Sequence, residues 1–292
     1  MLKNPRFRLL LGAALISFSP VYVALVSVPA TTSAFYRVAF GGIALVLWLL
    51  VRGGFKLPRP SVSMILIAAA FMFAADLWFW HRSIIYVGPG LSTLLGNFQV
   101  FFMTLAGIVL FGQKPRAVQL IAIPLAFVGL ALIVGIDWSA LTADYKAGIV
   151  FGLLTAVSYA AYLLLFRQAQ SLTRTTSADG LPTRELALVS LASALMLGAV
   201  AGAEGESLAI PTLSDGLWLV AYAVLAHVLG WLFIASSLAH VPAALIGLSL
   251  LLQPMLSFIW DILLFDRPIV ARELFGASLV LFGIWLGSRQ TE

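Results

Sequence analysis

The sequence contains no cysteine, only three histidines and few charged residues among its 292 positions. The lack of cysteine excludes disulfides, thiol catalysis and thiolate metal sites. Charged residues make up 10% of the chain, whereas hydrophobic residues make up 62% and the mean hydropathy is +1.05. Since average soluble proteins carry about a quarter charged residues, this balance excludes a soluble globular domain. The sequence also lacks a phosphate-binding glycine loop and a His-Glu-x-x-His motif, so we expect no ATP hydrolysis, no metal and no cofactor.

The apolar residues occur in runs of about 20, the length with which a helix crosses a hydrocarbon core of about 30 Å. We therefore predict an all-α membrane protein whose partners are the lipid bilayer and a small-molecule substrate. The net charge of +5 would also fit a nucleic-acid partner. Lys and Arg gathered on cytoplasmic loops explain this charge better, so we expect no nucleic-acid binding.

Turn residues divide the chain into ten predicted transmembrane helices. They cover residues 7–27, 33–51, 61–86, 91–111, 116–136, 146–168, 184–202, 214–239, 242–265 and 269–288. With the N-terminus inside, twelve Lys and Arg residues fall in inner segments and three in outer segments. Because cytoplasmic loops carry the excess of positive charge, we predict a multi-pass protein of the cell inner membrane with both termini in the cytoplasm.

The chain carries an internal repeat, since residues 79–132 align without a gap on residues 233–286. The less common matches are Gln99 with Gln253, Phe111 with Phe265 and Gly129 with Gly283. Five helices per half is an odd number, so the second half enters the bilayer from the opposite side. We predict two inverted five-helix repeats, residues 1–137 and 138–292. Such halves suit alternating access, with the substrate site where they meet, and one chain forms a whole pathway, so a monomer suffices.

Three stretches resemble a known transporter family. They read Asp76-Leu-Trp-Phe-Trp-His-Arg-Ser-Ile, Leu91-Ser-Thr-Leu-Leu-Gly-Asn-Phe and Leu110-Phe-Gly-Gln-Lys-Pro. Together with the ten predicted helices in two halves, they resemble the drug/metabolite transporter superfamily of EamA type, although Gln113 stands near a position where that family often has Glu. The resemblance implies a secondary transporter with a central cavity formed by both halves. Such proteins are often exporters of amino acids or other small metabolites, and aromatic amino acid exporters are the nearest analogy.

Inserting an ionisable residue into a membrane helix costs roughly 2.5–3.5 kcal/mol on insertion scales, so such residues are candidates for function. Asp76 lies midway along the third predicted helix and shares a helix face with Trp80. A carboxylate beside an indole suits a cationic or zwitterionic substrate. Asp76 could instead couple transport to protons or be a structural carboxylate. His227 and His81 are the other candidates for proton coupling, although either could be a histidine whose hydrogen bonds are satisfied locally.

Polar and aromatic side chains on six of the predicted helices indicate the pathway. Ser249, Gln253, Ser257 and Asp261 form a stripe on the ninth helix, which can face the cavity or join helices by hydrogen bonds. The predicted substrate-binding residues are Asp76, Trp80, Asn97, Gln253, Tyr159, Tyr162, Trp231 and Tyr22. The second, fifth, seventh and tenth helices are more uniformly apolar and should form the shell, with Gly129 and Gly283 allowing tight packing. We expect Arg37 to reach the outer interface with its long side chain, and Arg82 to do the same or to bind a substrate carboxylate.

Three functions compete on these grounds. The first is a secondary transporter that exports small metabolites, with amino acids and aromatic amino acids foremost, by alternating access. The second is an exporter of cationic or quaternary compounds, which the carboxylate and aromatic residues also fit. The third is an intramembrane enzyme that modifies a lipid, for which the spacing of Asp76 and His227 gives little support. We favour the transporter, which is not an enzyme.

Overall fold

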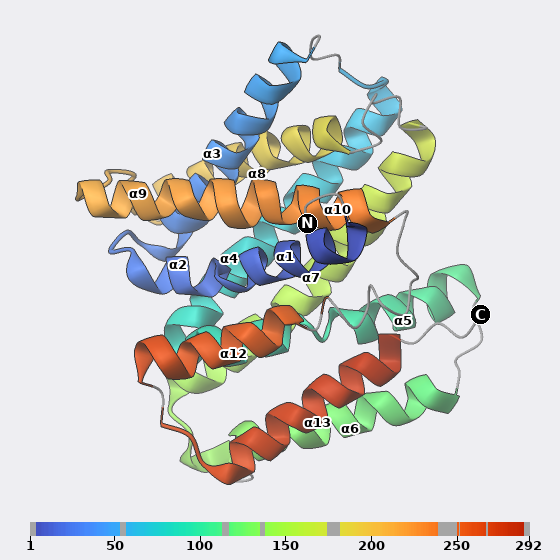
Figure 1. Cartoon of the computed structure of the whole chain (residues 1–292), viewed down its shortest axis with the longest axis vertical. Coiled ribbons are helices and arrows are strands. Elements are labelled where there is room, and N and C mark those ends of the chain that lie inside the picture. The colour runs from blue at the N-terminus through green and yellow to red at the C-terminus, as the bar shows by residue number, and fades with distance from the viewer. Residues whose placement is uncertain are drawn as a thin grey trace.

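A computed structural model describes residues 4–52, 57–112, 117–134, 138–173, 182–238, 250, 252–266 and 268–288. All regular structure in these residues is helical (Figure 1). The elements are α1 (Pro5–Ser17), α2 (Ser19–Leu25), α3 (Ala30–Val51), α4 (Pro60–Gly96), α5 (Gln99–Phe111), α6 (Ala117–Val134), η1 (Trp138–Ala140), α7 (Ala143–Thr173), α8 (Thr183–Ala203), α9 (Leu213–Ala221), η2 (Tyr222–Gly230), α10 (Trp231–Leu238), α12 (Leu252–Phe265) and α13 (Ala271–Ser288). The predicted all-α class is confirmed.

Within the described residues, six helical stretches are long and apolar enough to cross a membrane. They are Pro5–Leu25, Ala30–Val51, Pro60–Leu110, Ala143–Leu172, Thr183–Ala203 and Leu213–Ile234. Large apolar side chains such as Leu195 and Met64 are 78% and 72% exposed, as expected of a surface that faces lipid. One stretch, Pro60–Leu110, covers two predicted helices, and Ile121–Ile133 and Leu252–Phe265 are shorter apolar helices. The membrane class therefore holds, and the number of ten stays a prediction.

Three of the long stretches are interrupted, two of them beside a proline or at a glycine. The first stretch breaks at Phe18, just before Pro20, which has no N–H to donate to a carbonyl one turn earlier. Gly88 interrupts α4 with φ of 83°, a conformation that glycine adopts without strain, between the predicted helices 61–86 and 91–111. A further break separates α4 from α5 at Asn97 and Phe98. The eighth predicted helix changes instead to a π-helical segment, η2, between α9 and α10.

Helices of the first half pack chiefly against helices of the second half. α6 lies beside α13 at one end of the molecule's long axis, and α3 lies against α8 near the other end (Figure 1). Between them α4 packs on α7, and α1 packs on η2, α10 and α12. The interface between the predicted halves thus runs through the centre of the molecule.

The contact of α6 with α13 depends on glycines. A Cβ atom at Gly129 would lie 2.6 Å from the carbonyl oxygen of Gly276 and 2.7 Å from the backbone nitrogen of Val280. A Cβ at Gly283 would lie 3.0 Å from the carbonyl oxygen of Ala122. Small residues at such contacts let membrane helices approach closely, so the predicted role of Gly129 and Gly283 in tight shell packing is confirmed.

We expect Gly129→Ala to destabilise the protein because the backbone atoms that its methyl group would meet cannot move aside cheaply. Overpacking of this kind costs about 1–3 kcal/mol, which should lower the thermal unfolding midpoint in detergent by several degrees. Gly202→Ala is the matched control, since nothing lies within 4 Å of a Cβ atom there. Equal midpoints for the two variants would contradict the close α6–α13 packing.

At one end of the helices, two glutamates between α8 and α9 hold the start of α3 and the middle of α4. Glu204 forms an ion pair of 2.6 Å with Arg82 and accepts hydrogen bonds from Thr31 Oγ1 at 2.6 Å and Trp78 Nε1 at 2.9 Å. We call Glu204 and these three partners the Glu204 network. Glu206 accepts from the backbone N–H groups of Thr31 and Thr32, the free donors at the N-terminus of α3. Both glutamates therefore join the two halves.

The stability from the Glu204 network should depend on pH. Partial burial raises the pKa of Glu204, but hydrogen bonds from Thr31, Trp78 and Arg82, together with the Arg82 charge, lower that pKa overall. A carboxyl group with a lowered pKa in the folded state stabilises the fold fully above its ordinary pKa, about 4.3 for glutamate. This stabilisation is lost as the pH falls through the folded-state pKa.

We therefore expect Glu204→Gln to lower the unfolding midpoint at pH 7 by a few degrees, since charged hydrogen bonds contribute about 1.5–3 kcal/mol. The gap between wild type and variant should close as the pH falls below about 4. The measurement is the thermal midpoint of both proteins from pH 3 to pH 7. Asp144→Asn, at an exposed position in the first turn of α7, serves as the control. A gap that stays constant with pH would contradict the charge-dependent role of Glu204.

Candidate functional site

A cavity of about 240 Å³ lies in the centre of the molecule, between helices of both halves. Its walls come from α1, α2, α3, α4, α5, α7, α10 and α12. The lining residues are Ile16, Ser19, Pro20, Arg37, Phe73, Asp76, Leu77, Trp80, Thr93, Gly96, Asn97, Gln99, Thr155, Tyr159, Leu163, Trp231, Ile234, Leu250, Gln253 and Ser257. Most of the wall is apolar or aromatic and the polar groups are few, as is usual for small-molecule sites.

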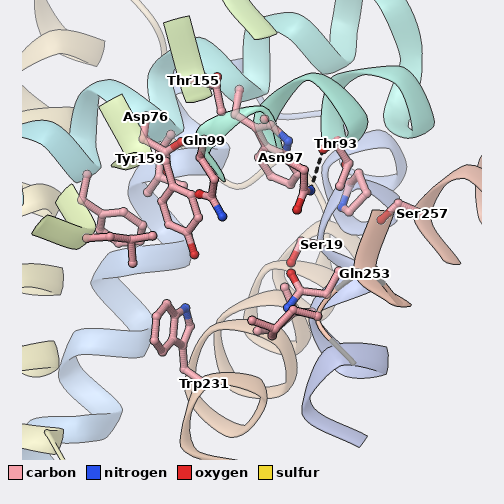
Figure 2. Close-up of a pocket in the computed structure, with 18 of the residues that line it drawn as sticks. Ser19, Asp76, Thr93, Asn97, Gln99, Thr155, Tyr159, Trp231, Gln253 and Ser257 are labelled. Atoms are coloured by element: carbon pink, nitrogen blue, oxygen red, sulfur yellow. Dashed lines mark hydrogen bonds between the residues drawn. The ribbon is translucent and has the colours of Figure 1, made fainter. Parts of the chain in front are cut away.

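Asp76 supplies a negative charge to the cavity wall. Its side chain is 7% exposed, and within the described residues it makes no ion pair or hydrogen bond. Trp80 lies one helical turn further along α4 and also lines the cavity. Figure 2 shows Asp76 on the same side of the cavity as Tyr159, with Trp231 facing the open space from α10. A carboxylate surrounded by aromatic faces can bind a cationic group.

The breaks in the helices provide much of the polar lining. Ser19 and Pro20 follow the α1–α2 break, and Asn97 and Gln99 lie at the α4–α5 break. On a continuous helix Asn97 and Gln99 would point about 200° apart, so a regular helix would not direct both side chains toward one cavity. The break turns both side chains toward the cavity, where Figure 2 shows Gln99 beside Tyr159.

Several buried polar atoms of the lining have no hydrogen-bond partner in the described part of the chain. They include Ser19 Oγ, Gln99 Oε1 and Thr155 Oγ1. In contrast, Asn97 Nδ2 donates to the carbonyl of Thr93 at 2.8 Å, the bond drawn in Figure 2. An unpaired buried polar group costs about 1–3 kcal/mol, so a polar molecule in the cavity would gain by bonding to these atoms.

Six of the predicted substrate-binding residues line the cavity together. They are Asp76, Trp80, Asn97, Tyr159, Trp231 and Gln253. The other two lie behind the wall. Tyr162 is fully buried and stacks on Phe73, with 4.6 Å between ring centres, while Tyr22 packs on Tyr222 at 5.8 Å. They can support lining residues, and their predicted contact with substrate is not seen at this cavity.

The two histidines predicted for proton coupling are fully buried outside the lining. His81 Nδ1 lies 2.7 Å from the carbonyl oxygen of Leu77, one turn earlier in α4. His227 Nε2 lies 2.9 Å from Ser190 Oγ of α8, and its ring stacks on Phe73 with 5.9 Å between ring centres. Each ring therefore has one local hydrogen bond, while its other nitrogen, His81 Nε2 or His227 Nδ1, is buried without a partner in the described part of the chain. Their roles in proton coupling stay predictions.

The structure corrects the expectation for Arg37, which does not reach an interface with water. Its side chain is 7% exposed and lines the cavity, and Nη1 donates a hydrogen bond of 2.8 Å to the Tyr222 hydroxyl. Because Arg37 lies near the outer end of its predicted helix, sequence position alone favoured the interface. No feature of the sequence indicated its neighbour on η2. Arg82 is instead held by Glu204 and stacks over Trp78 at 3.8 Å.

The polar stripe of α12 both lines the cavity and joins helices by hydrogen bonds. Gln253 lines the cavity opposite Asp76 and Gln99 in Figure 2. Ser257 Oγ donates to the carbonyl of Ser17 at 3.0 Å, and Asp261 accepts from the Gly90 backbone N–H at 3.0 Å. Ser257 therefore joins α12 to the α1–α2 break, and Asp261 joins it to the interruption of α4 beside Gly88. Ser249, like Gln113, lies outside the described residues.

The division into pathway and shell helices is largely as predicted. α6, α8 and α13 contribute no lining residue from the described part of the chain. The exception is α3, which was assigned to the shell and supplies Arg37.

Comparison with known proteins agrees with this architecture. A family model described as the EamA-like transporter family matches residues 7–135 and again residues 146–289. No curated protein matches the sequence. Among 27 matching chains of solved structures, one crystal structure is 16% identical, covers 98% of this chain and 98% of its own, and has a TM-score of 0.67. That identity supports likeness of fold alone, whereas the two family matches span most of the sequence. The chain belongs to the EamA-like transporter family, in the drug/metabolite transporter superfamily.

Proposed function

We propose that this protein is a secondary transporter that exports small metabolites, foremost amino acids including aromatic ones, across the inner membrane. The observation that carries the proposal is the central cavity, where the Asp76 carboxylate, which has no ion-pair partner among the described residues, is set among Trp80, Tyr159 and Trp231. The carboxylate suits the ammonium group of a substrate, and the aromatic rings suit an apolar side chain. Asn97 and Gln253 supply further hydrogen-bonding groups.

Alternating access fits the way in which the halves meet. Equivalent helices of the two predicted repeats pack on each other, α3 on α8 and α6 on α13, and the cavity lies between these pairs. At one end, the Glu204 network and Glu206 link α3 and α4 to the segment between α8 and α9. We place this end outside the cell, with both termini in the cytoplasm. Export then requires these contacts to open while contacts at the other end close.

An exporter of cationic or quaternary compounds is the second candidate. Asp76 beside Trp80 favours it as well, because a carboxylate and an indole face also recognise quaternary ammonium groups. The two candidates differ in whether the substrate carries a carboxylate.

The test is counterflow in proteoliposomes that contain the purified protein, with labelled phenylalanine, tyrosine and tryptophan and with an imposed pH gradient. Saturable uptake that internal unlabelled substrate accelerates is expected of a carrier. The response to the gradient tells whether Asp76 or His227 has a coupling role to be pursued. If a quaternary amine shows counterflow and no amino acid does, the second candidate replaces the first.

A further inference from the structure

Arg37 brings a second charge into the cavity wall, from a helix that sequence reasoning assigned to the shell. Its guanidinium is held by aromatic residues, with Cζ 4.9 Å from the ring centre of Tyr222 and 5.7 Å from that of Trp80. These contacts fix where the group lies, on the wall that Trp80 shares with Asp76.

The hydrogen-bonding capacity of Arg37 is largely unused. A guanidinium has five N–H donors. Within the described residues it makes one hydrogen bond, from Nη1 to the Tyr222 hydroxyl, and its Nε is buried without a partner. Arg82, in comparison, has Glu204 as its ion-pair partner. A buried charge without such a partner is costly in a membrane protein, and it is retained where it meets an ion.

Asp76 does not neutralise Arg37 by direct contact. The two charges interact, but no ion pair joins them in the described part of the chain. The cavity therefore presents a separate cationic group and a separate anionic group to its contents.

We propose that Arg37 binds the carboxylate of the substrate while Asp76 binds its ammonium group, so that the cavity selects α-amino acids over the amines that lack a carboxylate. This inference rests on the proposed transport function and narrows its substrate class. The planar fork of a guanidinium matches a carboxylate and can hold both of its oxygens. An amine without a carboxylate leaves Arg37 unpaired in the cavity, and unpaired buried groups are a strong source of discrimination.

The experiment compares three probes that share an aromatic ring: phenylalanine, phenethylamine and 3-phenylpropionate. Their binding to the purified full chain is measured by isothermal titration, and the transport of the first two is measured in proteoliposomes. For the wild type we expect phenylalanine to bind at least about tenfold more tightly than either single-charge probe, from the gain of a charged hydrogen bond.

The variants are Arg37→Gln, which removes the charge, and Arg37→Lys, which keeps the charge without the fork. Arg37→Gln should weaken phenylalanine binding about tenfold or more and leave phenethylamine binding little changed. Arg37→Lys should lie between wild type and Arg37→Gln. Arg52→Gln is the matched control, since Arg52 ends the same helix at an exposed position, over Trp48.

The outcomes separate this inference from the proposed function. Equal binding and transport of phenylalanine and phenethylamine by the wild type would overturn the role of Arg37 and leave a transporter of cationic substrates. Equal weakening of both by Arg37→Gln would show that Arg37 serves only to balance Asp76, which also overturns the inference. No binding of any probe by the wild type would remove both the inference and the aromatic amino acid assignment. The wild-type comparison remains decisive if Arg37→Gln does not fold.

Discussion

Replacing Asp76 by Asn is expected to reduce transport by about 100-fold while leaving the fold intact. The change keeps the shape of the side chain and removes its charge. A buried charged partner of a substrate contributes about 2–5 kcal/mol, and 2.8 kcal/mol corresponds to a factor of 100. Because Asp76 makes no hydrogen bond or ion pair in the described part of the chain, removing its charge breaks no such contact there and takes away only its longer-range interaction with Arg37.

The measurement is counterflow of phenylalanine by equal amounts of wild type and variant, with size-exclusion profiles and thermal midpoints as a check of folding. Asp144→Asn, on the exposed first turn of α7, is the matched control and should transport normally. If Asp76→Asn keeps normal affinity and rate, Asp76 is a structural carboxylate and the site must be sought among the other lining residues.

Locking Thr31 to Glu204 is expected to stop transport completely and reversibly. The Thr31 Oγ1 and Glu204 Oε2 atoms lie 2.6 Å apart and belong to opposite halves of the chain. The chain has no cysteine, so a Thr31→Cys, Glu204→Cys variant can be joined with a short bifunctional thiol reagent without background reaction. A closed link at this end prevents the opening that alternating access requires.

The readout is counterflow before cross-linking, after cross-linking and after cleavage of the link by a reducing agent. The two single-cysteine variants, treated in the same way, are the controls and should keep their activity. Transport that persists in fully cross-linked protein would show that this end stays closed throughout the cycle, which contradicts its role as a gate.

Hydrophobic runs were sufficient to predict the membrane class and the helical fold, because lipid leaves few alternatives for such segments. The site was predictable where the residues of a single helix were enough to indicate it. Asp76 and Trp80 share a face of α4, and both line the cavity. Gln99 was not among the predicted substrate-binding residues, because the periodic pattern assumes a continuous helix and the chain breaks at Asn97 and Phe98.

Arg37 shows a different limit of sequence reasoning. Its environment is formed by Tyr222 and Trp80, which belong to other helices and lie 185 and 43 positions away in the sequence. Local hydropathy contains no information about such partners, so the general rule that arginine reaches the interface was applied and proved wrong here. Tyr162 is a predicted substrate-binding residue that does not line this cavity. It lies one turn of α7 from Tyr159, yet it packs behind the wall on Phe73.

The interruptions of α1–α2 and α4–α5 have a consequence for mutational scans. Backbone carbonyl and N–H groups near a helix break belong to no side chain, and substitution by alanine does not remove them. At the α1–α2 break, the main-chain carbonyl of Ser17 accepts a hydrogen bond from Ser257, which lines the cavity, so the main chain positions part of the cavity wall. A scan of side chains will therefore find fewer sensitive positions than the cavity has polar contacts, and substitutions that straighten the breaks, such as Pro20→Ala, will reveal the remainder.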